Sequence, residues 1–179
     1  GDANRWEEAQ KAYSIALELS RLWNGELCLP TLTLRRQYAE ACYFAKDYAF
    51  AAREFTLYQQ HVRNFLYGEK VPSTLKGIVQ TAESYYYLHQ YSDAITAYRN
   101  LFASMHGEGL EWTHWDSREI GNFVEEARRF QSTEGYALVL SHVGDCFESA
   151  EVWQRAKDHY KDAAARWHLL KSYDNEALA

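Results

Sequence analysis

One spaced pattern recurs four times along the chain and constrains its fold more than any other feature. Each copy has a small residue between bulky, mostly aromatic side chains. The four copies are Trp6-Ala9-Tyr13-Ala16, Tyr48-Ala51-Phe55-Tyr58, Tyr91-Ala94-Tyr98-Leu101 and Trp153-Ala156-Tyr160-Ala163. Offsets of 3, 4 and 3 residues place the side chains of one copy on one face of an α-helix. The pattern therefore predicts four helices that each approach a neighbour closely at the small residue.

A second small residue stands twelve positions before three of these alanines. The second set is Ala39, Ala82 and Gly144, each within its own helical pattern. Short turns join the two helices of each pair, at 46–47, 89–90 and 150–151, and turns this short force antiparallel neighbours. We therefore expect an all-α protein, an α-solenoid of antiparallel helical hairpins with about seven or eight helices.

The repeated spacing resembles the tetratricopeptide repeat. Ala9 to Ala51 spans 42 residues and Ala51 to Ala94 spans 43, whereas the ordinary repeat has 34. The segment 68–75 is similar to the Gly-Glu-x-x-Pro-x-Thr-Leu linker of the kinesin-light-chain type, and 25–32 resembles it with one residue more between the glutamate and the proline. The resemblance covers about residues 5–106 and 134–168, and it implies a superhelix whose first helices line a concave surface.

The linker residues also have direct structural interpretations. A glycine suits the left-handed residue that ends a helix, a proline holds the chain extended before the next one, and a hydroxyl caps its start. In the two linkers these residues are Gly25 and Gly68, Pro30 and Pro72, and Thr31 and Ser73.

The regular spacing breaks after the third copy. Ala94 to Ala156 spans 62 residues, and the surplus of about one helix falls in 107–133. We expect a loop with Trp112 and Trp115 followed by an inserted helix capped by Asp116 or Ser117. The alternative assignment makes 117–131 a degenerate first helix that pairs with 134–149. The preferred division is a lone second helix (5–23), repeats at 31–67, 73–106 and 134–168, the 107–133 insertion, and a tail (169–179).

The ends suggest that the chain is a fragment of a longer protein. It begins on a second-helix pattern and stops soon after another, while terminal repeats of a solenoid normally carry a polar outer face. Uncapped ends also leave homo-oligomerisation open.

The composition excludes several classes of function. Its net charge of −6 argues against a nucleic-acid partner, and no apolar run is long enough to span a membrane. Three cysteines without metal spacing predict reduced thiols in a cytoplasmic protein. No catalytic motif is present, and His106 and His114 with Glu108 and Glu111 are more typical of a solvated loop than of a metal site. We therefore expect no enzyme activity, cofactor or metal.

The resemblance identifies the residues that would face the concave surface: they lie three before and one after the small residue, and one turn further on. They are Arg36, Glu40, Tyr43 and Phe44, then Val79, Glu83, Tyr86 and Tyr87, then Ser141, Asp145, Glu148 and Ser149. Two positions before the small residue, where kinesin-light-chain-type repeats carry asparagines that can hold a peptide backbone, stand Gln37, Gln80 and His142.

These positions favour a protein-interaction module. An acid follows each small residue, and an acidic row with aromatic neighbours favours an extended, Lys- or Arg-rich peptide. The alternative is a regulatory or scaffolding segment of a larger signalling protein that packs against its other domains in cis. Trp112 and Trp115 form a second candidate surface, unless they pack back onto the solenoid, as aromatic residues of helical insertions more often do.

Overall fold

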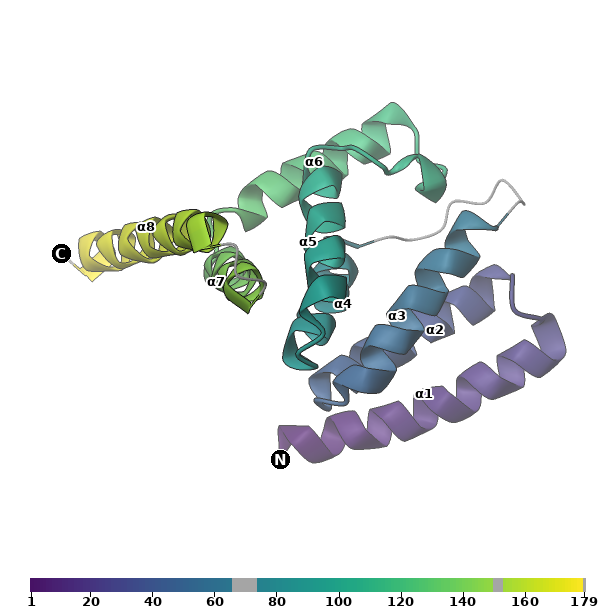
Figure 1. Ribbon diagram of the computed structural model, residues 1–179. Coiled ribbons are helices and arrows are strands. Elements are labelled where there is room, and N and C mark those ends of the chain that lie inside the picture. Colours follow the sequence, from purple (N-terminus) through teal and green to yellow (C-terminus); the bar gives the residue numbers. More distant parts are fainter. Residues whose placement is uncertain (66–73, 150–152, 179) are drawn as a thin grey trace.

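The computed structural model describes residues 1–65, 74–149 and 153–178, and every regular element in these ranges is helical. The elements are α1 (Asp2–Asn24), α2 (Leu29–Phe44), α3 (Tyr48–Arg63), α4 (Leu75–Tyr87), α5 (Tyr91–Met105), a 3-10 turn η1 (Glu111–Thr113), α6 (Ser117–Phe130), α7 (Glu134–Ser149) and α8 (Trp153–Leu178). The expected all-α fold, with successive helices packed on one another, is confirmed (Figure 1).

The helices stack as a series of hairpins. α1 packs on α2, and the pairs α2–α3, α4–α5 and α7–α8 form hairpins, joined by contacts of α3 with α4 and of α5 with α7. α2, α4 and α7 also contact one another in order. α6 packs on α5 and α4 without separating α5 from α7 (Figure 1). This arrangement corresponds to an inserted helix rather than to the alternative in which 117–131 begins a hairpin.

Two hairpin turns have the same backbone geometry. Lys46 and His89 occupy equivalent left-handed positions, with φ of 62° and 59°. In each turn the next residue donates its amide to the carbonyl five residues earlier: Asp47 to Cys42 at 2.8 Å and Gln90 to Tyr85 at 3.0 Å. This bonding satisfies carbonyls at the end of the first helix, as in a Schellman motif. The predicted turn at 150–151 lies outside the described residues.

The first linker differs from its prediction. Gly25 ends α1 with φ of 85°, as expected. However, α2 begins at Leu29, three residues earlier than a helix capped by Thr31 would, with Cys28 at the N-cap position and Pro30 in the first turn. A proline there sacrifices no hydrogen bond, so the helix can include it. Thr31 is therefore buried within α2, its hydroxyl 2.7 Å from that of Ser20, and the prediction that it caps the helix is wrong.

The other helix starts follow ordinary capping chemistry. Thr74 caps α4 by accepting the Gly77 amide at 3.0 Å, whereas the predicted linker residues 68, 72 and 73 lie outside the described ranges. Asp116 caps α6 in a reciprocal capping box with Glu119. Of the two predicted caps, Asp116 and Ser117, it is therefore the first that serves.

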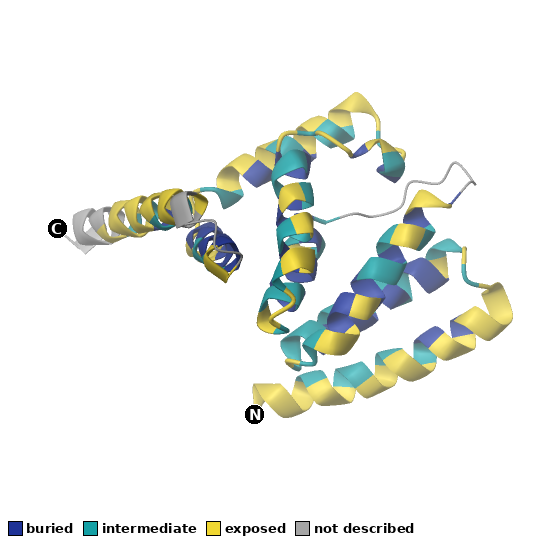
Figure 2. Ribbon diagram, in the orientation of Figure 1, coloured by how far each residue is buried: buried dark blue, intermediate teal, exposed yellow. Residues whose placement is uncertain are grey.

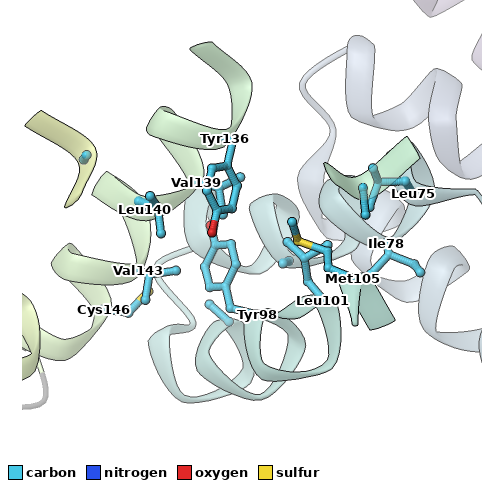
Figure 3. Close-up of a cluster of buried hydrophobic side chains, with 14 of the residues drawn as sticks. Leu75, Ile78, Tyr98, Leu101, Met105, Tyr136, Val139, Leu140, Val143 and Cys146 are labelled. Carbon is cyan, nitrogen blue, oxygen red and sulfur yellow. The ribbon is translucent and has the colours of Figure 1, made fainter. Parts of the chain in front are cut away.

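The main hydrophobic core lies between α4, α5 and α7. Figure 3 shows Tyr98 of α5 beside Val143 and other apolar side chains of α7, with Leu101 and Met105 of α5 on the side of Ile78 of α4. The predicted small residues mark close helix approaches, since Ala39, Ala51, Ala82 and Ala94 are fully buried. A Cβ atom on Gly144 would lie only 2.9 Å from the Tyr160 ring.

The outer helices are more exposed than the centre (Figure 2). α1 presents Ile15, Leu19, Leu22 and Trp23 to solvent, with Trp23 85% exposed. α8 continues as helix through Leu178, so the segment 169–178, expected as a tail, extends the last helix. No helix in the described part of the chain has the length and apolarity that a membrane crossing requires.

Candidate functional site

An almost continuous run of aromatic rings connects the hairpins. Trp6 stacks on Phe44 at 4.5 Å between ring centroids, and Phe44 meets the edge of Tyr43 at 5.6 Å. Tyr43 in turn contacts Tyr48, which stacks on Tyr87 at 4.7 Å. Burial, followed by the negative charge of the nearby Glu83, raises the pKa of Tyr43 well above its usual range. The predicted Tyr43, Phe44 and Tyr87 are thus part of the packing between repeats.

The run continues into α7 through a second set of rings. Tyr87 meets Tyr86 and His142 edge-on, and Tyr86 stacks on His142 with ring centroids 3.8 Å apart. His142 is 7% exposed. It therefore joins α7 to α4 and does not extend into a ligand-accessible surface.

Glu40 is partly exposed, but it has partners. Lys76 Nζ lies 2.6 Å from its carboxylate, and Arg36 lies 3.9 Å away on the same helix. Lys76 also lies over the Phe44 ring, 5.0 Å from its centroid. Glu40 is therefore neutralised across the α2–α4 contact.

Glu83 is not a surface acid. It is 3% exposed and accepts hydrogen bonds from the Tyr98 hydroxyl at 2.6 Å and from His142 Nδ1 at 2.5 Å. Burial and then the negative charge of Glu83 raise the pKa of Tyr98, which keeps its phenol protonated as a donor. This buried carboxylate joins α4, α5 and α7 through its donors.

Asp145 is enclosed by two phenols. Tyr86 donates to one of its oxygens and Tyr160 to the other. Tyr160 also lies 2.8 Å from the carboxylate of Glu148. Burial and these acids raise the pKa of Tyr86 and Tyr160, so both phenols remain donors.

The three predicted acids thus do not form a free acidic row. Tyr98 and Tyr160 each stand fifteen residues after their acid, and the same spacing leads from Glu40 to Phe55, which has no hydroxyl. Each phenol lies at the equivalent position of its second helix, and the repeat brings that position against the acid. The fifteen-residue spacing from acid to tyrosine was a sequence signal for internal pairing.

A groove lies where α2, α4 and α6 meet. It has a volume of about 460 Å³ and is mostly apolar, with Leu75, Val79, Phe130 and Tyr43 among its walls. This volume is within the range of ligand pockets in proteins. The first helices α2 and α4 supply two of its walls and the inserted helix α6 supplies the third.

Gln80 is the unusual polar residue of this groove. Its side chain lines the groove and is 5% exposed. Its Oε1 atom accepts no hydrogen bond from any residue that the structure describes. A buried acceptor without a donor costs about 1–3 kcal/mol, so such groups are rare in folded proteins. An incoming donor would remove that cost.

Charged side chains stand around the groove. Lys76 belongs to α4 and is paired with Glu40, whereas Glu126 and Arg129 belong to α6. Within the described ranges neither Glu126 nor Arg129 forms an ion pair. The rim therefore carries charges of both signs.

Sequence reasoning found part of the groove. Tyr43, Val79 and Gln80 were predicted, while Leu75, Lys76 and the α6 residues were missed. Lys76 was detectable, because it lies one helical turn before Val79 and Gln80 on the same face. The α6 contribution was not, since no repeat register places an inserted helix.

The remaining predicted residues lie elsewhere. Arg36 is half-buried against α3 and α4, with an unpaired Nε, and Gln37 is half-buried on α2. Ser141 donates to the carbonyl of Ala137 within α7, and Ser149 is exposed at its end.

The two tryptophans of the insertion pack inward. Trp112 contacts the cluster of Leu32, Tyr58, Val62 and Phe65. Trp115 packs against Phe123 at 5.6 Å between ring centroids. Neither lines the groove. Their inward packing disfavours them as a separate binding surface.

No arrangement typical of a metal site occurs in the described ranges, where no three His, Cys, Asp or Glu side chains gather suitably. His114 instead has Nε2 3.1 Å from the carbonyl of Phe65. Burial raises the pKa of the Cys42 and Cys146 thiols to about 12, which makes them poor nucleophiles.

Comparison with protein-family models found no match, and comparisons with curated proteins and with solved structures found none either.

Proposed function

We propose that this chain is a non-catalytic protein-interaction module that binds a peptide segment in the groove between α2, α4 and α6. The tetratricopeptide-like spacing of the sequence supports a repeat protein of this kind, acting in the cytoplasm. The internal pairing of Glu40, Glu83 and Asp145 removes the main reason to expect a Lys- or Arg-rich ligand. Apolar contact is the main source of affinity in this proposal.

One observation carries the proposal: Gln80 lines a groove with apolar walls, and its buried Oε1 has no hydrogen-bond partner among the described residues. A peptide supplies both complements, because its backbone N–H donates to Oε1 while an apolar side chain fills the groove. A purely apolar ligand would leave the acceptor unpaired, and a strongly charged one would have to lose its hydration against the apolar walls.

The test begins with a displayed library of linear peptides selected on the intact chain. Selected peptides are labelled with a fluorophore and titrated with wild type and with Val79→Lys, which places a charge in the groove. We expect Val79→Lys to weaken binding at least tenfold. Phe130→Ala, which removes part of the α6 wall, is expected to weaken it as well.

Ile95→Lys is the matched control. Ile95 is a half-buried, β-branched residue on α5 that lines a different cleft. It is expected to leave peptide affinity unchanged. Thermal unfolding of all variants separates lost binding from lost folding. Selected peptides that bind folded Val79→Lys and Phe130→Ala as well as wild type would contradict the proposal, and so would a failure to select any peptide.

A further inference from the structure

A second cleft, separate from the groove, lies between α5, α7 and α8. Its volume is about 340 Å³, and it shares no lining residue with the groove. Apolar side chains from two helices form its floor: Ile95, Phe102, Val143 and Phe147. The cleft is large enough for a small organic ligand.

The floor is fixed by packing. Val143 and Phe147 are 2% and 7% exposed. His159 of α8 stacks nearly parallel on Phe147, with ring centroids 5.4 Å apart. Burial lowers the pKa of His159 despite nearby carboxylates, so its imidazole is neutral at pH 7 and adds a flat, uncharged wall.

Two guanidinium groups border this floor from different helices. Arg99 projects from α5 and Arg155 from α8. Arg155 lies over the Phe147 ring, 5.6 Å from its centroid, and this contact holds it beside the floor. In the described ranges neither arginine forms an ion pair, although the chain has more acids than bases. Among the described residues, Asp158 is the only acid that lines the cleft.

We propose that this cleft binds an organic carboxylate with an apolar body. The planar guanidinium groups match a carboxylate through paired N–H donors, while Phe102 and Phe147 contact the body of the ligand. An isolated inorganic anion would leave the apolar floor unused, and a neutral apolar molecule would gain no charge-assisted hydrogen bond from the two arginines. This inference does not depend on the proposed peptide groove.

The test uses 3-phenylpropionate as the probe and 3-phenylpropanamide as its uncharged counterpart. Both are titrated into the intact chain while amide and methyl NMR signals are recorded. We expect the carboxylate to bind at least tenfold more tightly than the amide and to shift signals of Ile95, Phe102 and Phe147. Acetate, which lacks an apolar body, is expected to bind at least tenfold more weakly than 3-phenylpropionate.

The variants are Arg99→Gln and Arg155→Gln, alone and combined. Each single change is expected to weaken 3-phenylpropionate about tenfold, and the double variant to bind acid and amide equally. Arg128→Gln is the matched control, because Arg128 is an exposed arginine on α6. Arg99 and Arg155 are exposed, so their substitution is expected to leave the fold intact, and thermal unfolding checks this.

Two sources can supply this chemistry, a free acid or the C-terminal residue of another chain. An acetylated peptide ending in phenylalanine, compared with its C-terminal amide, distinguishes them. Tight binding of the peptide acid that is lost in the double variant supports the site and identifies a chain terminus as ligand. Equal affinity of wild type for 3-phenylpropionate and its amide would overturn the proposal, as would undiminished binding by the double variant.

Discussion

The two halves of the stack bury charge in different ways. In the first half, Arg35 is 4% exposed and lies between Glu54, which is also buried, and Glu26, whose carboxylate is 2.9 Å away. In the second half, the buried Glu83 is held by a phenol and an imidazole, Tyr98 and His142. The first network depends on a full positive charge and the second on side-chain donors that are not permanently charged.

This difference indicates which half is more sensitive to a single substitution. Arginine cannot lose its charge in a protein, so removing one member of its pair leaves an uncompensated buried charge. A carboxylate with two donors retains one of them when the other is removed. A substitution in the buried network of the N-terminal half is therefore expected to destabilise the protein more than one in the network of the C-terminal half.

The largest expected effect is that of Arg35→Met. The substitution leaves the carboxylate of Glu54 buried without its main partner, and we expect a loss of about 3–5 kcal/mol in the free energy of unfolding. Urea unfolding followed by circular dichroism measures it.

Arg53→Met is the control for this prediction. Arg53 lies 3.7 Å from the same Glu54, but its side chain is 65% exposed, so its loss is expected to change stability by less than about 1 kcal/mol. The double variant Arg35→Met/Glu54→Met should recover most of the loss. Equal effects of the two single arginine substitutions would show that the N-terminal network does not differ from a surface pair.

Tyr98→Phe is the corresponding change in the second half, and it makes this repeat like the first, where Phe55 occupies the position. Glu83 then keeps only His142, and we expect a loss of about 1.5–3 kcal/mol, as for a hydrogen bond to a charged group. Tyr160→Phe is expected to cost less, because Asp145 is only partly buried and retains Tyr86. Urea unfolding in which Tyr160→Phe matches or exceeds Tyr98→Phe would contradict this ranking.

The sequence predicted the helices and their close contacts because these depend on local periodicity. Ala51 and Ala94 occupy the same register and share the same burial, and Lys46 and His89 make the same turn. What the period does not encode is which side chain from another helix meets a given one. Glu40, Glu83 and Asp145 occupy the same position of the repeat, yet their partners differ. Glu40 pairs with a lysine, Glu83 with a phenol and an imidazole, and Asp145 with two phenols.

The groove was only partly predictable for the same reason. Val79 and Gln80 follow from the repeat register, whereas Arg129 and Phe130 reach the groove through the packing of an inserted helix. The sequence predicted an inserted helix here, but not on which helices it would pack. Its buried residues are Phe123 and Ala127. Tertiary placement of an element outside the repeat requires the structure.

A smaller effect on the second half is expected from Gly144→Ala. The new Cβ would lie 2.9 Å from the Tyr160 ring, and the hydrogen bonds of Tyr160 to Asp145 and Glu148 limit its movement. We expect a loss of about 1–3 kcal/mol from overpacking. Gly121→Ala is the control, since nothing lies within 4 Å of its added Cβ on α6; it should stabilise the helix by up to about 1 kcal/mol. Thermal unfolding of both variants measures the contrast.

The smallest expected effect concerns one histidine in each half. Burial lowers the pKa of His61 and of His159, and at His61 the charge of Arg35 lowers it further. The unfolded chain therefore binds protons more readily at these sites, and their contribution to stability, complete above pH of about 6.5, is lost as the pH falls. His61→Gln and His159→Phe should each reduce the fall in melting temperature between pH 7 and pH 5.

Salt distinguishes the two histidines and extends the comparison of the halves. Burial is the largest cause of the lowered pKa at both histidines and is not screened by salt, whereas the repulsion between Arg35 and protonated His61 is partly screened. In 0.5 M sodium chloride the effect of His61→Gln on the pH dependence should therefore shrink, and that of His159→Phe should persist. If salt changes both effects equally, the buried charge of Arg35 does not act on His61, and the halves differ less electrostatically than their networks indicate.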